Sequence, residues 1–169
     1  MNKGILTIYT DGSHLKHTTG RLGMGGVLID ENGNKLAEFS KELDTNYLKR
    51  CFGTADVSNP TCELLANLFA LVQFRDYLKD CTKVFMVADY EGVQKFNLKQ
   101  WKAKLPYIKR IVELTDQEVK KQGLERKINY RWVKGHQRSI LDEDGMWNSY
   151  VDKLAKGQEG WLRNVVPVV

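Results

Sequence analysis

Hydrophobic and polar positions change period several times along the chain, and each period predicts a different kind of element. Residues 5–10 are a β-branched and aromatic run, which is typical of a strand. Two further strands are predicted at residues 23–29 and 35–42. Asn32-Gly33 lies between them and is typical of a tight hairpin turn. The chain is therefore expected to begin with antiparallel strands.

The middle of the chain has helical spacing. A polar segment that runs to about residue 58 is predicted as a loop. Asn59 and Pro60 are then typical of a helix N-cap and a first helical position. Leucines recur three and four residues apart between 61 and 78, which predicts one long helix. Residues 84–88 are continuously apolar, which indicates a strand that is buried on both faces.

The remaining pattern completes an α/β domain. Further elements are predicted as helices at 92–98, 106–122 and 145–156 and as a strand at 128–133. Strands that first follow one another and then alternate with helices predict a mixed sheet with helices packed on it. No repeat or linker divides the chain, so residues 1–169 are expected to form a single domain. The apolar tail at 165–169 either packs on the body or frays.

Composition is typical of a globular protein, with 42% hydrophobic and 28% charged residues. No apolar stretch approaches the roughly 18 residues of a membrane span, and the first residues lack a cleavage-like region. We therefore expect a cytoplasmic protein that does not enter a membrane. Cys51, Cys62 and Cys81 are odd in number and include no Cys-x-x-Cys pair. They are expected to be reduced thiols, not a disulfide framework or a zinc site.

The net charge of +5 is unevenly distributed. Residues 95–138 carry thirteen Lys and Arg against four Asp and Glu, so the rest of the chain is net negative. A basic third beside an acidic remainder indicates a polyanionic partner. The alternative is a basic surface that is simply solvated.

Four acidic residues lie where folding explains them poorly: Asp11, Glu63, Asp89 and Asp152. Each has an ordinary explanation, such as a turn at Asp11-Gly12 or a favourable helix dipole at Glu63. As a set they are harder to dismiss, because functional groups of open sheets gather at the carboxyl ends of strands. Clustered carboxylates repel unless cations neutralise them. Their oxygens suit Mg²⁺ or Mn²⁺, and two such ions can act together on a phosphodiester.

The chain resembles a known family, the type 1 ribonucleases H. Six segments carry the resemblance, in the family's order: Ile8-Tyr9-Thr10-Asp11-Gly12-Ser13, Gly23-Met24-Gly25-Gly26-Val27, Glu63-Leu64-Leu65-Ala66, Val87-Ala88-Asp89, Trp132-Val133-Lys134-Gly135-His136 and Asn148-Ser149-Tyr150-Val151-Asp152-Lys153-Leu154-Ala155. Each segment is weak alone, but together they are specific and span most of the chain. Residues 89–93 and 101–103 also resemble a branch that is often fused to a viroplasmin-like hybrid-binding domain, which is not expected in this chain.

The resemblance implies a fold and an activity. The fold is a five-stranded mixed sheet whose first three strands are antiparallel, with helices on both faces. The activity is endonucleolytic hydrolysis of the RNA strand of RNA/DNA hybrids, which leaves 5′-phosphate and 3′-hydroxyl ends. The cofactor is a pair of Mg²⁺ ions, with Mn²⁺ as a possible substitute. A monomer is expected, and a polymerase or replication partner is left open.

The resemblance also assigns roles to residues. Asp11, Glu63, Asp89 and Asp152 are implied to be the catalytic residues that bind the metals, and His136 to assist the water or product release. The 2′-hydroxyl distinguishes RNA from DNA. Main-chain groups of Gly12, Ser13 and Cys62 are candidates for recognising this hydroxyl. Asn59 is a further candidate substrate contact.

The chain departs from the family pattern after His136. Fifteen residues separate His136 from Asp152, which is a longer loop than the bacterial pattern leads us to expect. Asp142, Glu143 and Asp144 in that loop either hold a metal or are solvated, and solvation is the preferred interpretation. The length of the loop puts the role of His136 in doubt.

The basic handle of some bacterial members is shortened, and a compact cluster of Lys99, Trp101, Lys102 and Lys104 takes its place. An indole can pack on deoxyribose while lysines meet phosphates, which gives salt-sensitive binding. Alternatively, Trp101 anchors the following helix in the core.

Three other functions compete with a ribonuclease H. A non-catalytic nucleic-acid-binding module would keep the basic cluster but has no need of all four carboxylates. A transposase-like or junction-resolving nuclease would share the carboxylates but not the combined Thr-Asp-Gly-Ser, Lys-Gly-His and Asn-x-x-x-Asp pattern. A protein-interaction domain would leave the carboxylates unexplained.

Overall fold

The structure is a computed structural model that describes residues 4–15, 20–134, 142–158 and 165–169. Its elements in chain order are β1 (Ile5–His14), β2 (Arg21–Ile29), β3 (Lys35–Asp44), α1 (Thr45–Phe52), α2 (Asn59–Gln73), α3 (Arg75–Leu78), β4 (Lys83–Ala88), α4 (Glu91–Asn97), α5 (Pro106–Lys121), β5 (Ile128–Trp132) and α6 (Glu143–Ala155). The strands form one sheet in the order β3-β2-β1-β4-β5. β1, β2 and β3 pair antiparallel, whereas β4 lies parallel to β1 and β5 parallel to β4. The predicted mixed sheet is confirmed.

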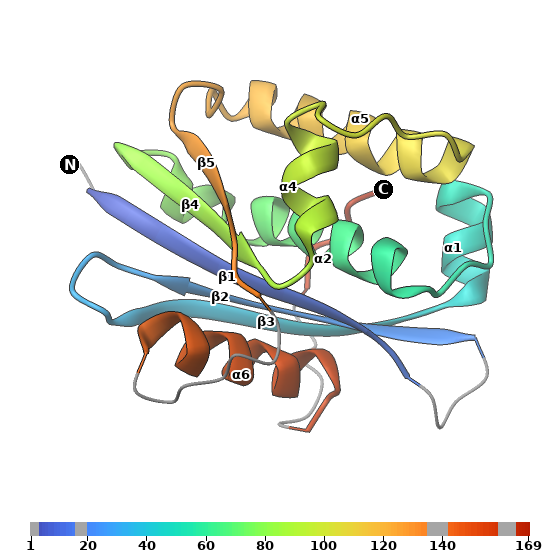
Figure 1. Cartoon of the computed structure of the whole chain (residues 1–169), viewed down its shortest axis with the longest axis horizontal. Coiled ribbons are helices and arrows are strands. Elements are labelled where there is room, and N and C mark those ends of the chain that lie inside the picture. Colours follow the sequence, from blue (N-terminus) through green and yellow to red (C-terminus); the bar gives the residue numbers. More distant parts are fainter. Residues whose placement is uncertain (1–3, 16–19, 135–141, 159–164) are drawn as a thin grey trace.

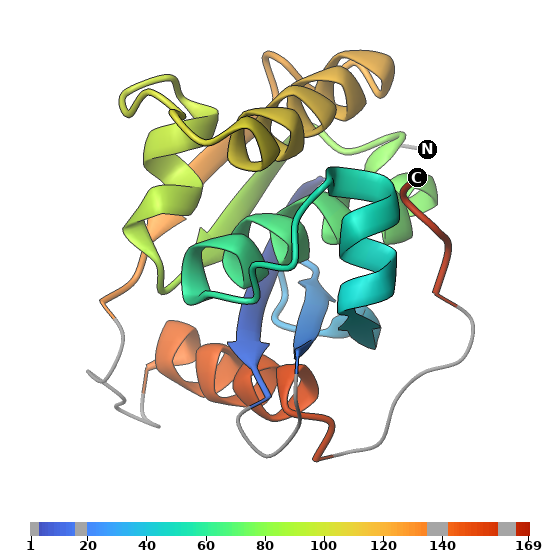
Figure 2. The same cartoon turned by 90° about the vertical axis from the view of Figure 1, so that its right-hand side faces the viewer.

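Helices cover the two faces of the sheet unequally (Figure 1). α6 lies on one face, and α2 with α1, α4 and α5 lies on the other, as Figure 2 shows from the side. Side chains alternate along each strand and so serve two cores. In β1, Leu6 and Ile8 pack in the larger core with α2, and Tyr9 packs in the smaller core with Val151 and Leu154 of α6.

The helix α1 occupies a segment that the sequence predicts as a loop, and that prediction is wrong. Asp44 caps its first turn by accepting a hydrogen bond from the backbone N–H of Tyr47 at 2.9 Å. Gly53 ends the helix in the left-handed conformation with φ +68°. Leu48 and Phe52 lie one turn apart and are buried. The two caps and this buried pair explain why a short polar segment forms a helix.

The bounds of α2 and β1 also differ from the prediction. Ser58, not Asn59, is the N-cap of α2, and the helix ends at Gln73 instead of continuing unbroken to residue 78. β1 continues through Asp11 and Gly12 to His14. Asp11-Gly12 is therefore part of the strand and not a turn, because both residues pair with β2.

Two glycines allow helices to approach the sheet closely. A Cβ at Gly12 would lie 2.3 Å from the carbonyl carbon and oxygen of Cys62 in α2. A Cβ at Gly25 would lie 2.8 Å from the backbone oxygen of Val151 in α6. Helices from opposite faces thus meet the sheet where β1 carries Asp11.

We expect Gly12→Ala to lower the free energy of unfolding by about 3 kcal/mol, because backbone atoms of α2 cannot yield to the added methyl group without moving the helix. Gly123→Ala is the control: nothing lies within 4 Å of its Cβ position, and only the left-handed φ of +69° opposes the change. That strain costs about 1–2 kcal/mol. Urea unfolding of both variants tests the order, and a Gly12→Ala loss no larger than that of Gly123→Ala would contradict the close approach.

The C-terminal tail packs on the body. Val165 and Val168 contact the larger core. The Gln73 side chain donates to the carbonyl of Val166 and accepts from its N–H, both at 2.7 Å. Cys51, Cys62 and Cys81 form no disulfide in the described part of the chain. None of the helices in the described part of the chain is long and apolar enough to cross a membrane.

Candidate active site

The pairing of β1 with β4 brings two predicted carboxylates together. The parallel ladder ends with the pair Tyr9 and Val87, and Asp11 and Asp89 each follow that pair by two residues. Residues two apart lie on the same side of an extended chain. A carboxylate oxygen of Asp11 and one of Asp89 lie within 4.8 Å of each other, so the two residues meet beyond the parallel pairing.

Glu63 reaches the same point from α2. The preceding residue, Cys62, lies against Gly12, so the first turns of α2 are held beside Asp11. One carboxylate oxygen from each of Asp11, Glu63 and Asp89 lies within 4.8 Å of the other two. Asp11 and Glu63 are only 4% and 5% exposed. The sheet and α2 thus bury two acidic groups next to a third.

Asp152 approaches from the other face, on α6. Its negative charge acts on Asp11 and helps to raise the pKa of that carboxyl group. Lys156, one turn further along α6, donates to Asp152 Oδ2 at 3.0 Å. Three elements and the segment after β4 therefore supply the four carboxylates that the sequence singled out.

Burial dominates the electrostatics of the cluster. It raises the pKa of Asp11 to about 8; hydrogen bonding with Glu63 opposes this rise, and the negative charges of Asp89 and Asp152 add to it. Burial likewise raises the pKa of Glu63 well above its ordinary value, and the charges of Asp11 and Asp89 act in the same direction. A buried carboxylate that resists ionisation lacks positive charge nearby.

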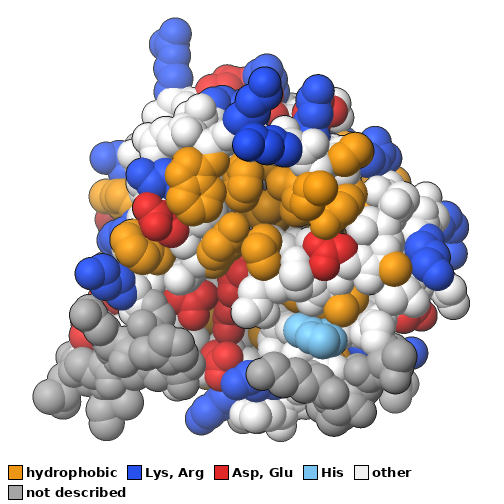
Figure 3. Space-filling view, turned by 45° about the vertical axis from the view of Figure 1, so that its right-hand side comes forward, with side chains coloured by type: hydrophobic (Ala, Val, Ile, Leu, Met, Phe, Trp, Pro, Cys, Tyr) orange, Lys and Arg blue, Asp and Glu red, His pale blue; other side chains and the backbone are white. Residues whose placement is uncertain are grey.

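The donor set fits a divalent cation. Glu63 Oε2 is buried and has no hydrogen-bond partner among the described residues, which is costly for a carboxylate oxygen that no cation contacts. Oxygen ligands alone are what Mg²⁺ and Mn²⁺ prefer. Figure 3 shows acidic side chains gathered in a hollow of the surface, below a band of hydrophobic side chains. Within the cluster Asp11 and Glu63 are buried and Asp89 is half-buried, so the cluster reaches the surface through Asp89.

The predicted substrate-reading residues lie around this cluster. The N–H of Gly12 donates to Asp11 Oδ1 at 3.0 Å, and Cys62 is fully buried against Gly12. The hydroxyl of Ser13 donates to the carbonyl of His14 at 3.4 Å. Asn59 is exposed at the start of α2. Gly12 and Cys62 thus adjoin the carboxylates, whereas Asn59 stands further out, four residues before Glu63.

The predicted basic-aromatic cluster forms a pocket of about 460 Å³ beyond α4. Lys99, Trp101 and Lys102 line it, together with Lys109 of α5; Lys104 lies outside this lining. Trp101 is 40% exposed, so the interpretation of it as a core anchor is wrong. Lys109 is absent from the predicted set. It lies in the first turn of the predicted helix that follows Lys104, and this closeness in sequence could have identified it.

The turn that follows the C-terminal end of α4 holds Trp101 at the wall of this pocket. Lys99 has a left-handed φ of 62°, and the N–H groups of Gln100 and Trp101 both donate to the carbonyl of Lys95, at 2.8 and 3.0 Å. The turn places the Trp101 ring edge-on to Phe96, with 5.5 Å between ring centroids. Hydrogen bonds of this kind close a helix end, so the indole is held in place at the pocket wall.

Two of the acidic residues at 142–144 make structural contacts that the sequence did not indicate. Asp144 Oδ1 accepts hydrogen bonds from the Tyr9 hydroxyl at 2.5 Å and from Arg131 at 2.8 Å, which joins α6 to β1 and β5. Asp142 caps α6 by accepting from the N–H of Asp144. Solvation is therefore the wrong interpretation for Asp144, and His136 lies outside the described residues.

Asp144→Asn is expected to lower the free energy of unfolding by about 1–3 kcal/mol, because it weakens two charge-assisted hydrogen bonds that converge on one oxygen. Asp116→Asn is the matched control, since the pair that Asp116 forms among the described residues is with Lys120, on the exposed surface of α5. Such a pair contributes about 0–1 kcal/mol. Equal losses in urea unfolding would show that Asp144 does not fasten α6.

The RNase H family model matches residues 3–159, which is nearly the whole chain. No curated protein sequence matches the chain significantly.

Solved structures share the fold at low sequence identity. RNase H1 from the halophilic archaeon Halobacterium salinarum NRC-1 superposes with a TM-score of 0.67 at 17% identity, over 90% of this chain and 96% of that one. LC11-RNase H1, in a complex with an RNA/DNA hybrid, gives 0.69 at 20% identity, over 92% and 95%. The protease-reverse transcriptase of prototype foamy virus gives 0.63 at 21%, over 94% of this chain but 21% of that one.

Proposed function

Because this chain belongs to the RNase H family and is a ribonuclease H, we propose that it is a metal-dependent endonuclease for the RNA strand of RNA/DNA hybrids. The observation that carries the proposal is the convergence of Asp11, Glu63 and Asp89, with Asp152 beside them. The similar LC11-RNase H1 has been captured with an RNA/DNA hybrid, which supports the choice of substrate.

The four carboxylates would hold two Mg²⁺ ions, or Mn²⁺ ions in their place. When bound, these ions supply the activation of water and the stabilisation of charge that phosphodiester hydrolysis needs. The expected products carry a 5′-phosphate and a 3′-hydroxyl. The chain's own contribution is to hold acidic side chains from β1, α2, α6 and the segment after β4 close together.

Selection of RNA is proposed to depend on backbone groups next to the carboxylates. Gly12 and Cys62 are held against each other, and Ser13 follows directly. A 2′-hydroxyl both donates and accepts hydrogen bonds, so main-chain groups in this place can distinguish RNA from DNA. Asn59 is proposed as an outer contact to the same strand.

The second strand is proposed to lie on the basic pocket. Lys99 and Lys102 would contact phosphates, and the exposed indole of Trp101 would pack on a sugar. Lys109 adds positive charge to the lining of the pocket, and Lys104 is proposed as a further phosphate contact. His136 is proposed to assist the water or product release. Action as a cytoplasmic monomer stays a prediction.

The test is cleavage of an end-labelled RNA/DNA hybrid beside single-stranded RNA, double-stranded RNA and double-stranded DNA, with Mg²⁺ and with chelator. Metal-dependent cutting confined to the RNA strand of the hybrid is the expected result. Binding of the hybrid without cutting would replace the proposal with a binding module. Cutting of the DNA duplex would replace it with a broader nuclease.

A further inference from the structure

Asp56, in the loop before α2, gathers four hydrogen bonds on one carboxylate. Its Oδ1 accepts from the N–H of Ser58 at 2.9 Å. Its Oδ2 accepts from the hydroxyls of Ser58 at 2.9 Å, Thr61 at 2.7 Å and Tyr107 at 2.7 Å. The Tyr107 bond joins residues 51 positions apart, so Asp56 connects two helices that the sequence separates widely.

One side of this network leads to the carboxylate cluster. Thr61 lies in the first turn of α2, is fully buried and directly precedes Cys62 and Glu63. The thiol of Cys62 donates to the carbonyl of Val57 at 3.3 Å, which fastens the same loop a second time. Asp56 therefore fixes the end of α2 from which Glu63 reaches the site.

The other side leads to the basic pocket. Tyr107 is the second residue of α5, and Lys109, on the same turn of that helix, lines the pocket. The pocket-lining residues 99–103 lie just upstream of this turn. A displacement of the first turn of α5 would therefore move part of the pocket relative to Glu63.

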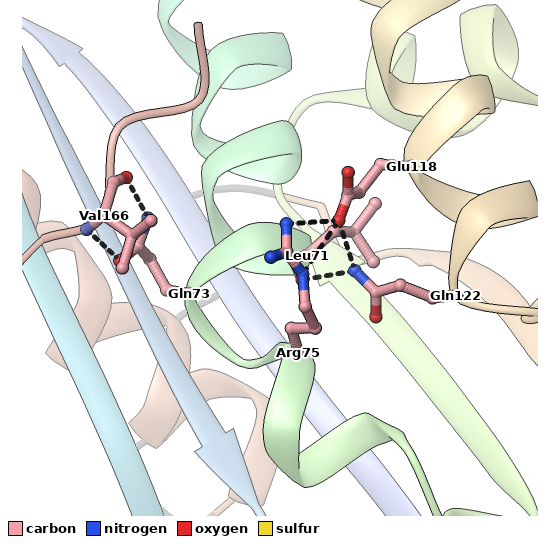
Figure 4. Close-up of polar contacts among 6 residues, drawn as sticks. All are labelled: Leu71, Gln73, Arg75, Glu118, Gln122 and Val166. Carbon is pink, nitrogen blue, oxygen red and sulfur yellow. Dashed lines mark hydrogen bonds and ion pairs between the residues drawn. The ribbon is translucent and has the colours of Figure 1, made fainter.

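The opposite ends of the two helices have a separate connection, away from the site. Arg75, just after α2, donates to Glu118 of α5 at 2.9 Å, and Gln122 donates to the carbonyl of Leu71 at 2.8 Å (Figure 4). Gln122 also donates to Glu118 at 2.8 Å. The helix pair is thus connected at both ends, and of these two connections the one through Asp56 lies at the end that carries Glu63.

We propose that Asp56 is a positioning residue that sets the distance between the carboxylate cluster and the basic pocket, so that one nucleic-acid duplex engages both. This inference rests on the proposed function. A stiff ligand gains from two subsites only when their separation matches its own. A small displacement of bound substrate from the reacting groups is also costly in rate.

Single hydroxyl deletions test the two sides separately. Tyr107→Phe frees α5, so we expect the KM for a long hybrid to rise about fivefold while kcat stays within about twofold. Thr61→Val frees the end of α2, so we expect kcat to fall about tenfold; Thr61→Ser, which keeps the hydroxyl, restores it. Glu118→Gln is the matched control at the other end of the same helices, with both constants unchanged although stability falls.

A second substrate separates positioning from general damage. On the shortest hybrid that the wild-type protein cleaves, which cannot span both subsites, Tyr107→Phe should have no effect on KM. Equal KM changes for Tyr107→Phe and Glu118→Gln, or equal changes on long and short hybrids, would overturn the proposal. Urea unfolding confirms that each variant is folded under assay conditions.

Measuring hybrid binding in the absence of catalysis distinguishes failure of the proposed activity from failure of the proposed role of Asp56. Fluorescence anisotropy of a labelled long hybrid, measured in chelator, should show about fivefold weaker binding for Tyr107→Phe than for Glu118→Gln. If the wild-type protein fails to cut hybrids but this difference is found, the proposed activity fails and the role of Asp56 stands. If cleavage is found without this difference, the role of Asp56 fails alone.

Discussion

Asp11→Asn is expected to reduce metal-dependent cleavage of an RNA/DNA hybrid by on the order of 10³-fold, with hybrid affinity changed by less than about threefold. Asp11 lies in the middle of the cluster, between Glu63 from α2 and Asp152 from α6. The substitution keeps the shape of the side chain but removes one negative charge from the set that would hold the cations. The basic pocket, which is proposed to supply much of the affinity, is left intact.

Initial rates on a labelled hybrid and anisotropy in chelator measure the two quantities. Asp116→Asn is the control, because it removes one exposed carboxylate of α5 that is not part of the cluster. It should change neither quantity beyond about twofold. Substantial activity in Asp11→Asn would remove Asp11 from the catalytic set, and a large loss of hybrid binding would mean that the charge of the cluster governs affinity as well.

The sheet was predictable because its signals are local. Apolar runs, the hairpin at Asn32-Gly33 and the later alternation of strands with helices each depend on a few adjacent residues, and the mixed sheet is confirmed. The helix α1 was missed because its stability comes from the caps Asp44 and Gly53 and from burial of Leu48 against other elements. Burial of that kind is a tertiary effect that polar composition conceals.

The turn predicted at Asp11-Gly12 shows the same limit in a functional residue. Asp-Gly is common in turns, yet here both residues pair with β2 and the glycine is required by the backbone of Cys62. What decides the conformation is a helix that begins almost fifty residues later. The resemblance to a family identified the residue, whereas propensity alone gave the wrong local structure.

Some residues of the candidate site were likewise predictable from the sequence, and others were not. The four carboxylates were found because each breaks a local expectation, although their roles stay predictions. Asp144 and Asp56 were not found, because their partners lie far along the chain: Tyr9 is 135 positions from Asp144, and Tyr107 is 51 positions from Asp56. Acidic residues in polar loops look solvated until the fold places hydroxyl and guanidinium donors around them.

The metal-free protein is expected to lose stability as pH rises, because burial and neighbouring charges raise the pKa of Asp11 from 3.8 to about 8. Between these values the folded state holds a proton that the unfolded state has released. The stabilisation is therefore complete below about pH 4 and is lost as pH rises through about 8. Asp11→Asn removes this titration, so in chelator the variant should exceed the wild-type protein by about 2–4 kcal/mol at pH 9, with little difference near pH 4.

Urea unfolding in chelator, at several pH values between 5 and 9, measures the difference between the two proteins. Mg²⁺ should then reverse the order at high pH, since a ligand that binds only the folded wild-type protein stabilises it by mass action. Asp116→Asn is the control here as well, because Asp116 forms an exposed ion pair with Lys120 and is not one of the clustered carboxylates. A constant difference for Asp11→Asn would mean that Asp11 is ionised throughout, which requires a positive group beside it that offsets its burial. Loss of stability with rising pH would instead show that burial of Asp11 beside other carboxylates costs stability once it ionises, and that bound cations offset this cost.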